Sequence, residues 1–404
     1  LVLAGGEGRR LQPLTQDRAK PAVPFAGRYR LIDFVLSNLV NSGYHQIKVL
    51  TQYKASSLIS HITRGWQLAP ILGQYVEPVP AQMRVGRDWF KGSADAVFQN
   101  LNLVEDCHPD VVAVFGADHI YKMDVTQFVE YHRDKDAELT MAAIPVPIEQ
   151  GSAFGVLQVA EDGRLLDFVE KPENPPPMPG NPNMCLASMG NYLFDSKPLV
   201  EEIQKDAQID DSAHDFGKSI ITNMVGRRRV FVYDFATNTH PGMEPKEQGY
   251  WRDVGSLHSY WAASMDLVAV TPTFNLYNRL WPMRTTYQHL PPAKFVFDFE
   301  RTGRRGYATD SLVSPGCIVS GSHVALSVLF SDVRVHSFCH IDQAVILPHS
   351  EIGEGCRLTK VVIDRGCKVP PGTVIGEDAE LDAQRFFRSA TGVVLVTRDM
   401  LDKL

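Results

Sequence analysis

Three features are missing from this 404-residue chain, and each absence argues against a class of protein. No apolar run approaches the roughly 20 residues that a membrane-spanning helix needs. Its 47 Asp and Glu residues outnumber 40 Lys and Arg, giving a net charge of −7, whereas a nucleic-acid-binding protein needs a basic face. Its six cysteines include no C-x-x-C pair, so neither a zinc cluster nor a disulfide framework is indicated. Reduced cysteines of a cytoplasmic protein are expected instead.

Length and composition bound the architecture. The chain is 44% apolar and 22% charged, as is ordinary for a globular protein, and it is longer than one hydrophobic core usually serves. We therefore expect a first domain over residues 1–270, a proline-containing linker over 271–310 and a second domain over 311–404. Leu1 already falls in a predicted strand, so we expect the complete protein to begin upstream of it.

The first domain alternates short apolar runs with helical stretches. This alternation predicts a Rossmann-like α/β fold of three layers, built on a mostly parallel sheet. In such sheets ligands collect at the carboxyl ends of the strands. Strands are expected over residues 47–50, 111–115, 139–144, 156–159 and 230–232. Helices are expected over residues 34–41, 94–104, 125–133 and 199–204.

The last hundred residues carry a six-residue repeat of aliphatic positions. The repeat groups into triples whose starts lie 17 residues apart, at Leu312, Leu329, Ile346 and Ile363. Small residues stand two positions before many of the aliphatic ones. This pattern is typical of a parallel left-handed β-helix of hexapeptide type, in which each column stacks inside a three-sided coil. In the first coil it places Gly316 and Ile318 inside, and elsewhere it uses most of the cysteines as small core residues.

Glycines and cations follow the first predicted strand. Gly5, Gly6 and Gly8 let the backbone turn sharply and bring N–H groups close to a phosphate. Arg10 then offers a planar fork for phosphate oxygens, and Lys20 adds a compact charge. The full string, Gly-Gly-x-Gly-x-Arg-Leu-x-Pro-Leu-Thr-x4-Lys-Pro, differs in spacing from the dinucleotide fingerprint and from the P-loop. It predicts a site for a polyphosphate.

Two carboxylates are candidates for holding a divalent cation beside that site. Asp118 follows the strand expected over residues 111–115, in Gly-Ala-Asp-His, and Asp253 lies in Trp-Arg-Asp-Val-Gly. Magnesium prefers one or two carboxylates together with phosphate oxygens. The residues alone leave other roles open, because Asp118 fits a turn cap and Asp253 fits a helix N-cap equally well.

A second group of residues suits a sugar phosphate. Lys171 closes an apolar strand before a proline-rich loop, where a cation can bind a phosphate; a solvated lysine is the alternative. Ser188 and Tyr192 are able to bond sugar hydroxyls. The string Ser-Ala-His-Asp that starts at Ser212 suggests a hydrolase triad, but its members are too close in sequence to face one another. The chain also has no G-x-S-x-G elbow, so a hydrolase is not favoured.

Taken in order, these motifs resemble the bacterial glucose-1-phosphate adenylyltransferases, a branch of the sugar-1-phosphate nucleotidyltransferases. The resemblance runs nearly end to end and includes the hexapeptide repeat. Its segments cover residues 3–21, 31–34, 51–53, 92–96, 116–121, 145–148, 168–172, 186–190, 214–218, 250–255 and 290–295.

The resemblance implies a reaction, a set of site residues and partners. The reaction converts ATP and glucose 1-phosphate to ADP-glucose and diphosphate, the first committed step of glycogen synthesis. Catalytic roles are implied for Arg10, Lys20 and Asp118, with Asp118 and Asp253 as ligands of Mg²⁺. Nucleotide contacts are implied at Gly5, Gly6, Gly8, Gln52, Trp89 and Phe90. Contacts to glucose 1-phosphate are implied at Gly155, Glu170, Lys171, Ser188, Tyr192 and Asp215. A homotetramer is implied, with glycolytic sugar-phosphate effectors bound at Arg18, Arg30 and Arg365.

Two positions depart from the family pattern. Phe90 stands where the family often has tyrosine, which keeps stacking and loses a hydroxyl. Asp17 stands where the best-known enterobacterial relatives have an activator-binding lysine, which predicts a different activator preference. Three alternatives stay open: transfer of a uridylyl or thymidylyl group, a β-helix acyltransferase, and a non-catalytic regulatory paralogue. The last would be expected to lose Arg10, Asp118 or Lys171, and this chain keeps all three.

Overall fold

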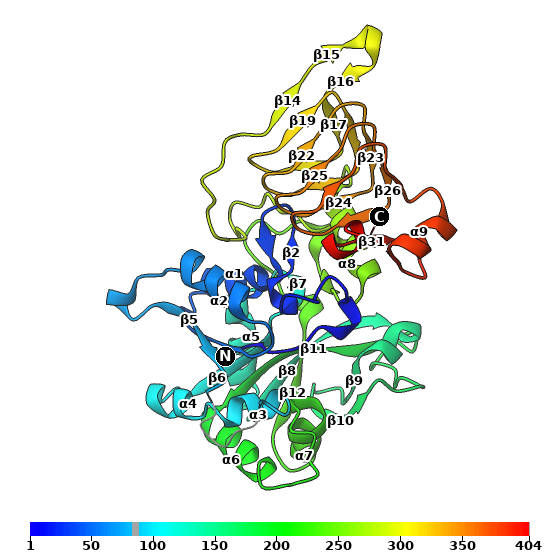
Figure 1. Ribbon diagram of the computed structural model, residues 1–404. Helices are drawn as coiled ribbons and strands as arrows, with labels where there is room; N and C mark the ends of the chain where they lie inside the picture. Colours follow the sequence, from blue (N-terminus) through cyan, green and yellow to red (C-terminus); the bar gives the residue numbers. More distant parts are fainter. Residues whose placement is uncertain (83–88, 404) are drawn as a thin grey trace.

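The computed structural model describes residues 1–82 and 89–403, which form an α/β domain followed by a β-helix (Figure 1). The α/β domain is built on a nine-stranded sheet with the path β10-β9-β11-β6-β1-β4-β5, and β8 joins β11 to β12. The strands are β1 (Val2–Ala4), β4 (Gln46–Thr51), β5 (Tyr75–Pro80), β6 (Val111–Gly116), β8 (Leu139–Pro147), β9 (Gly155–Val159), β10 (Leu165–Glu170), β11 (Met184–Asp195) and β12 (Val230–Asp234).

The sheet is mixed, so the prediction of a mostly parallel sheet was wrong. β6, β1, β4 and β5 run parallel, as do β8 and β12. The pairs β9–β10, β9–β11, β8–β11 and β6–β11 are antiparallel. The physical reason lies in the connections: β8 to β11 follow one another with no α-helix between them, and short links join antiparallel strands only.

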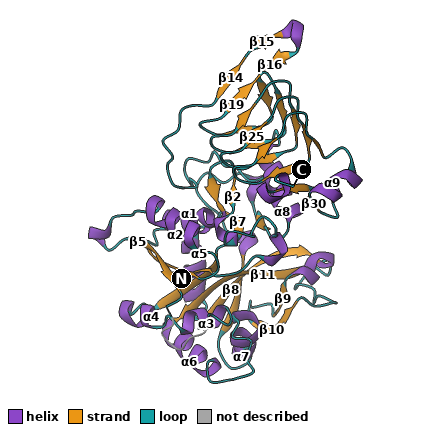
Figure 2. Cartoon of the chain, viewed as in Figure 1, coloured by secondary structure: helices purple, strands orange, loops and turns teal. Residues whose placement is uncertain are grey.

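Helices cover both faces of this sheet, which confirms the three-layer prediction (Figure 2). One face carries α1 (Leu31–Asn41), α2 (Ser56–Gly65) and α5 (Val125–Asp134). The other carries α3 (Ser93–Phe98), α4 (Asn102–Cys107), α6 (Ser196–Asp206) and α7 (Thr222–Met224). The helix expected over residues 94–104 is broken. The Asn100 side chain donates to the Ala96 carbonyl at 2.8 Å while its backbone N–H turns to Val97, and this local competition ends α3.

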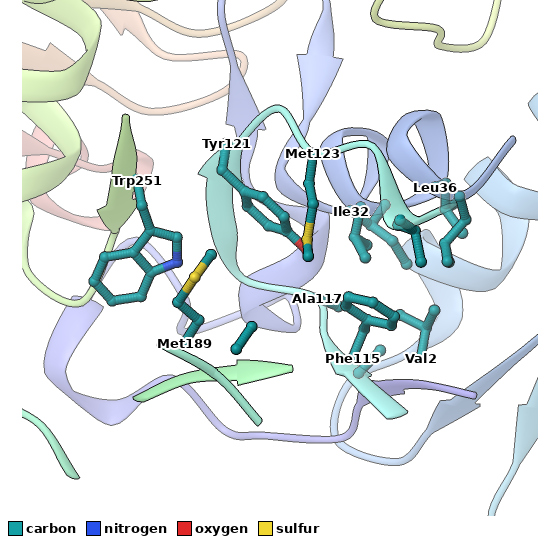
Figure 3. Packing of buried hydrophobic residues seen from close by; sticks show 14 of the residues in the cluster. Val2, Ile32, Leu36, Phe115, Ala117, Tyr121, Met123, Met189 and Trp251 are labelled. Carbon is teal, nitrogen blue, oxygen red and sulfur yellow. The ribbon is translucent and has the colours of Figure 1, made fainter. Parts of the chain in front are cut away.

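The core under α1 fixes the strand ends that matter for function. Val2 and Phe115 pack against Ile32 of α1, and the chain beyond β6 returns through buried Tyr121 to Trp251 (Figure 3). A two-stranded ribbon is formed there by β7 (His119–Tyr121) and β13 (Trp251–Asp253), paired antiparallel. This ribbon brings two segments 130 residues apart in the sequence into direct contact.

The second domain is a parallel β-helix with three sheets, one for each side of the coil, consistent with the left-handed hexapeptide type. One side holds β14 (Lys294–Val296), β19 (Ile318–Ser320), β22 (Arg334–Val335), β25 (Glu351–Ile352) and β28 (Lys368–Val369). The next holds β17 (Tyr307–Thr309), β20 (His323–Ala325), β23 (His340–Asp342), β26 (Arg357–Thr359) and β29 (Val374–Ile375). The third holds β18 (Leu312–Val313), β21 (Val328–Leu329), β24 (Val345–Ile346), β27 (Val361–Ile363), β31 (Val394–Val396) and β30 (Phe387–Arg388). A short hairpin, β15 (Asp298–Phe299) with β16 (Arg304–Arg305), projects from its first coil.

The repeat is confirmed from the second coil onward and was misplaced by one residue in the first. Neighbouring coils pair 17 residues apart, as His323 with His340, but the first coil pairs 16 apart, as Val313 with Leu329. Val313 and Val319 therefore replace Leu312 and Ile318 in the inward columns. Cys317, buried completely, likewise takes the place expected for Gly316. All six cysteines lie in the described residues and are free thiols, with Cys317, Cys339, Cys356 and Cys367 inside the coil.

The third side of the β-helix packs on the α/β domain. Leu329 points into the coil, while its neighbour Val328 packs outward among aromatic residues of the first domain that include Phe25 and Tyr260. Tyr260 belongs to α8 (Leu257–Val268), which lies against this face. β14 also lies within the segment expected as linker, and it pairs with β19 as the first strand of the coil. Among the described residues, each helix is too short or too polar to traverse a bilayer.

Candidate active site

A cleft of about 670 Å³ opens at the carboxyl ends of β1, β4 and β6. Because these strands are parallel neighbours, the segments that follow them meet at one edge of the sheet. The cleft is lined by the glycine segment from Gly5 to Gly8, by Arg10 and Lys20, and by Gln52 and Asp118. Gly8 has φ +66°, and an added Cβ would lie 3.0 Å from the Lys20 side chain, so glycine is needed for the turn.

Two carboxylates and a buried ammonium form the centre of this cleft. Lys20 Nζ donates to Asp118 Oδ2 at 2.7 Å and to Asp253 Oδ1 at 3.1 Å. Arg10 approaches Asp253 at 3.7 Å from the solvent side. The β7–β13 ribbon makes this convergence possible, because it pairs His119, next to Asp118, with Asp253. The structure thus brings together four residues that the sequence singled out separately.

Electrostatics hold this centre in its charged form. Burial raises the pKa of the Asp118 carboxyl, but His119 and Lys20 outweigh burial and keep that pKa well below its usual value. Burial likewise lowers the pKa of Lys20, yet Asp118 and Asp253 outweigh it, and the net pKa is raised. The carboxylates are therefore anionic and the ammonium cationic throughout the physiological range.

His119 is a site residue that sequence reasoning missed. Its Nε2 lies 3.5 Å from Asp118 Oδ1 and 4.0 Å from Asp253 Oδ1, and donor atoms of the three side chains lie within 4.8 Å of one another. Its ring stacks at a tilt on Trp251, with centroids 4.9 Å apart, which fixes the imidazole against the carboxylates. Its place directly after Asp118 in Gly-Ala-Asp-His was the available signal.

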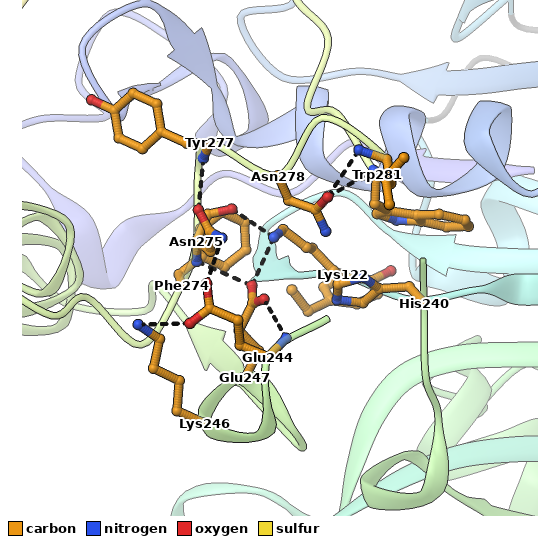
Figure 4. Close-up of polar contacts among 12 residues, drawn as sticks. Lys122, His240, Glu244, Lys246, Glu247, Phe274, Asn275, Tyr277, Asn278 and Trp281 are labelled. Carbon is orange, nitrogen blue, oxygen red and sulfur yellow. Dashed lines mark hydrogen bonds and ion pairs between the residues drawn. The ribbon is translucent and has the colours of Figure 1, made fainter. Parts of the chain in front are cut away.

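The far end of the ribbon is anchored by a buried ion pair (Figure 4). Lys122, one residue beyond β7, donates to Glu247 Oε1 at 2.7 Å and to the Asn275 carbonyl at 2.6 Å. The ammonium also lies 4.9 Å from the centre of the Phe274 ring. Burial lowers the pKa of Lys122, and Glu247 opposes that shift. This anchor ties the ribbon to the segment that leads from α8 toward the β-helix.

The nucleotide side of the cleft is shaped by backbone pairing. Gln52 accepts the Phe90 N–H at 2.6 Å and donates back to the Phe90 carbonyl at 3.4 Å. Phe90 lines the cleft, while Trp89 is 61% exposed beside it. Gly92 also lines the cleft and has no room for a side chain, because an added Cβ would lie 2.2 Å from the His214 carbonyl oxygen.

The expected sugar-phosphate residues gather around a bulge in β11. The pairing of β11 with β8 shifts between Ser188 and Tyr192, at Gly190 with φ +68°, and such bulges re-aim neighbouring side chains. Burial raises the pKa of Tyr192 well above its ordinary value, so its phenol remains a hydrogen-bond donor. Glu170 and Lys171 close β10, with their charged groups 3.5 Å apart.

Two further residues complete that side. Gly155 sits under Phe168, and a Cβ there would approach the ring to 2.6 Å and Glu170 Oε2 to 3.0 Å. Asp215 accepts the Ser93 hydroxyl at 2.8 Å through Oδ2, and its Oδ1 accepts the backbone N–H groups of Gly217 and Lys218. The Ser-Ala-His-Asp string is no triad, as expected.

Comparison with known proteins agrees with this geometry. The nucleotidyl transferase family model matches residues 1–269, and a GlmU-like C-terminal hexapeptide model matches residues 291–396. A glucose-1-phosphate adenylyltransferase of Anaeromyxobacter sp. (strain Fw109-5) is 54% identical over 401 residues, which span 99% of this chain and 98% of the relative. Proteins of the same name are 51% identical in Pectobacterium carotovorum subsp. carotovorum (strain PC1), over 100% and 95% of the two chains, and 50% identical in Methylococcus capsulatus, over 99% and 93%.

The chain belongs to the glucose-1-phosphate adenylyltransferase family.

This member of the family has a second pocket, of about 620 Å³, where the two domains meet. Asp17, Arg18 and Arg365 line it. Arg18 makes a two-pronged ion pair with Asp364 of the β-helix, at 2.8 and 3.1 Å. Burial lowers the pKa of Arg30 to about 10, and the charges of Arg365 and Arg18 add to the shift. The three arginines named from the sequence are therefore electrostatic neighbours in the structure.

Proposed function

We propose that this chain transfers the adenylyl group of ATP to glucose 1-phosphate, giving ADP-glucose and diphosphate at the start of glycogen synthesis. One observation carries the proposal: Lys20 bridges Asp118 and Asp253 directly beside the glycine segment, inside a cleft of polyphosphate size. The names of relatives that match this chain over nearly its whole length support the same reaction.

The reaction asks the protein mainly to hold two anions together. A phosphate oxygen of glucose 1-phosphate attacks the α-phosphorus of ATP in line, an O–P bond forms, and the bond to the β-phosphate breaks as diphosphate leaves. The nucleophile is already an anion, so no strong general base is required. Arg10 and Lys20 neutralise the triphosphate, and Lys171 holds the phosphate of the sugar; positioning and charge provide the catalysis.

The carboxylate pair fits a magnesium ion. Asp118 and Asp253 supply hard oxygen ligands within 4.8 Å of each other and of His119, and Mg²⁺ favours such carboxylates together with phosphate oxygens. When bound, Mg²⁺ neutralises the triphosphate and the leaving diphosphate. The buried His119 Nδ1 has no hydrogen-bond partner among the described residues, so His119 is the least constrained member of the set.

One assay tests the proposed function. Diphosphate release is measured with glucose 1-phosphate and each of ATP, UTP, dTTP and GTP in turn, with Mg²⁺ present. We expect release with ATP to exceed the others by at least about 10-fold in kcat/KM, a difference of about 1.4 kcal/mol. A preference for UTP or dTTP would make the chain another sugar-nucleotide transferase. No release with any nucleotide would make it a regulatory paralogue.

The Lys171→Ala variant is expected to raise the KM for glucose 1-phosphate by about 10-fold or more and to leave the KM for ATP nearly unchanged. The reason is that the lysine contacts the phosphate of one substrate only. Steady-state kinetics with each substrate varied in turn provide the check. Lys197→Ala, which removes an 87% exposed lysine on α6, is the control. An equal rise in both KM values would assign Lys171 to the triphosphate instead.

We also propose that the pocket at the domain junction takes a sugar-phosphate effector. Arg18, Arg30 and Arg365 supply positive charge from both domains, and Arg18 lies two residues from Lys20 in the sequence. An anion held there can therefore bias the segment that carries Lys20, which is what control of a distant site requires.

Asp17 is expected to set the preference for that effector. Because its carboxylate lines the same pocket, the second phosphate of a bisphosphate would meet a like charge. Fructose 6-phosphate should activate better than fructose 1,6-bisphosphate, and Asp17→Lys should reverse the order. Activation curves for both sugars on both proteins decide the matter. A wild type that prefers the bisphosphate, or a variant with unchanged preference, would contradict the prediction.

The family resemblance also leads us to propose a homotetramer in the cytoplasm. The oligomer is tested by light scattering of the purified chain, for which we expect four times the mass of one chain.

A further inference from the structure

The Ser-Ala-His-Asp string has a structural arrangement that the proposed reaction does not use. Asp206, the last residue of α6, accepts the Ser212 hydroxyl at 2.5 Å through Oδ1 and bonds His214 Nδ1 at 2.8 Å through Oδ2. The backbone N–H of His214 in turn donates to Ser212 Oγ at 3.0 Å. Asp206 is 3% exposed and His214 is 6% exposed. We name this set of three residues the His214 clasp.

The clasp holds His214 in a costly conformation whose carbonyl is put to use. His214 has φ +48°, a left-handed geometry that costs a residue other than glycine about 1 kcal/mol or more. In that geometry its carbonyl accepts the N–H groups of Ala94 at 2.8 Å and Asp95 at 3.3 Å, at the first turn of α3. The same carbonyl fills the space above Gly92. The clasp thereby fixes the start of α3, on the nucleotide side of the cleft.

A second link leads from α3 back to the sugar side. The Ser93 hydroxyl donates to Asp215 Oδ2 at 2.8 Å and accepts the Phe216 N–H at 2.9 Å. Gly92 and Ser93 both line the nucleotide cleft. Asp215 lies close enough to Tyr192, on the sugar-phosphate side, to contribute to the raised pKa of that phenol. Two hydrogen-bonded connections therefore join the nucleotide side to the sugar side.

We propose that the His214 clasp and the Ser93–Asp215 bond couple the two substrate sites, so that each substrate tightens the binding of the other. A nucleotide that orders residues 89–93 fixes Ser93 and hence Asp215, and glucose 1-phosphate then binds an already ordered partner. Thermodynamic linkage makes the effect reciprocal. Asp206 and His214 are positioning residues in this scheme. The inference rests on the proposed function, because it takes Asp215 as a contact of glucose 1-phosphate.

The test measures coupling at equilibrium. The dissociation constant of α,β-methylene-ATP, which cannot transfer its adenylyl group, is measured with and without saturating glucose 1-phosphate. We expect the sugar phosphate to tighten binding by about 5-fold or more in the wild type, within the usual range of coupling between sites. In Asp206→Asn, an isosteric change, the ratio should fall below about 2-fold. Each ligand alone should bind within about 3-fold of its wild-type affinity, which separates lost coupling from a damaged site.

A matched control and a second variant sharpen the result. Asp195→Asn removes another carboxylate paired with a buried histidine, His132 at 3.3 Å, in the same domain, and should keep the wild-type ratio. Ser93→Ala breaks the connection at its other end and should lower the ratio as Asp206→Asn does. If both act through one connection, the double variant loses no more coupling than either single variant.

Two results would overturn the inference: a wild type whose ratio is 1, or both single variants with the full wild-type ratio. Diphosphate release from ATP by the wild type is scored separately. Failure of that assay overturns the proposed reaction, whereas the ratio alone decides the role of the clasp.

Discussion

Asp118→Asn is expected to fold normally and to lose about 10²-fold or more of its kcat. The change is nearly isosteric, but it removes one of two carboxylates that face Lys20 and the candidate magnesium site. Loss of a major electrostatic contributor typically costs that much. Turnover is measured as diphosphate release at saturating ATP, glucose 1-phosphate and Mg²⁺, and the melting temperature reports folding.

The matched control is Asp110→Asn, which changes an exposed carboxylate at the opposite end of β6. We expect that variant to keep wild-type turnover, since Asp110 precedes the strand and Asp118 follows it. A kcat for Asp118→Asn close to that of the control would remove Asp118 from the metal site.

The second large effect is expected in the β-helix, where Ile352→Asp should prevent a stable fold of that domain. Ile352 is fully buried inside the coil and pairs with Val335 and Val369 of the neighbouring turns. Truncating such an aliphatic side chain costs about 2–5 kcal/mol. A buried carboxylate with no partner adds a desolvation cost, so the total takes a large part of the roughly 5–15 kcal/mol that stabilises a protein.

The neighbouring residue supplies the control. Glu351 faces outward, where it bonds His336 Nε2 at 2.7 Å and stands between Arg334 and Lys368 in the strand ladder. Glu351→Gln and Glu351→Lys should each cost about 1 kcal/mol or less, as for a surface ion pair, with lysine the worse because it adds a third cation to the ladder. Melting temperatures of the three variants, followed by circular dichroism, provide the measurement. Equal melting temperatures for Ile352→Asp and Glu351→Lys would show that the register is wrong.

Some of the site was legible from local sequence because local chemistry decided it. Gly5, Gly6 and Gly8 come directly after one strand, and Asp118 comes directly after another. In an α/β sheet the ends of parallel strands share one edge, so their convergence in one cleft follows from chain direction alone. The β-helix register was legible for a similar reason, since its period is printed in the sequence and each column repeats.

The places where prediction failed are those where distant contacts decide. The first coil is one residue shorter than the others, and an aliphatic residue stands on either side of the shift, so only the pairing of Val313 with Leu329 and of Val319 with Val335 shows which ones face inward. The antiparallel half of the sheet likewise depends on how β11 pairs with three other strands, which no periodicity records.

The sequence alone therefore determined the two-domain plan, the three-layer and coiled architectures, and the residue types of a polyphosphate site, because hydrophobic period and strand-end motifs act over a few residues. Tertiary structure decided how those residues are held. It brought Asp253 to Asp118 through the β7–β13 ribbon and set His119 against both carboxylates. It also joined Ser93 to Asp215 across 122 residues. Such contacts depend on chain segments that meet only when the whole domain has packed, and no local pattern encodes them.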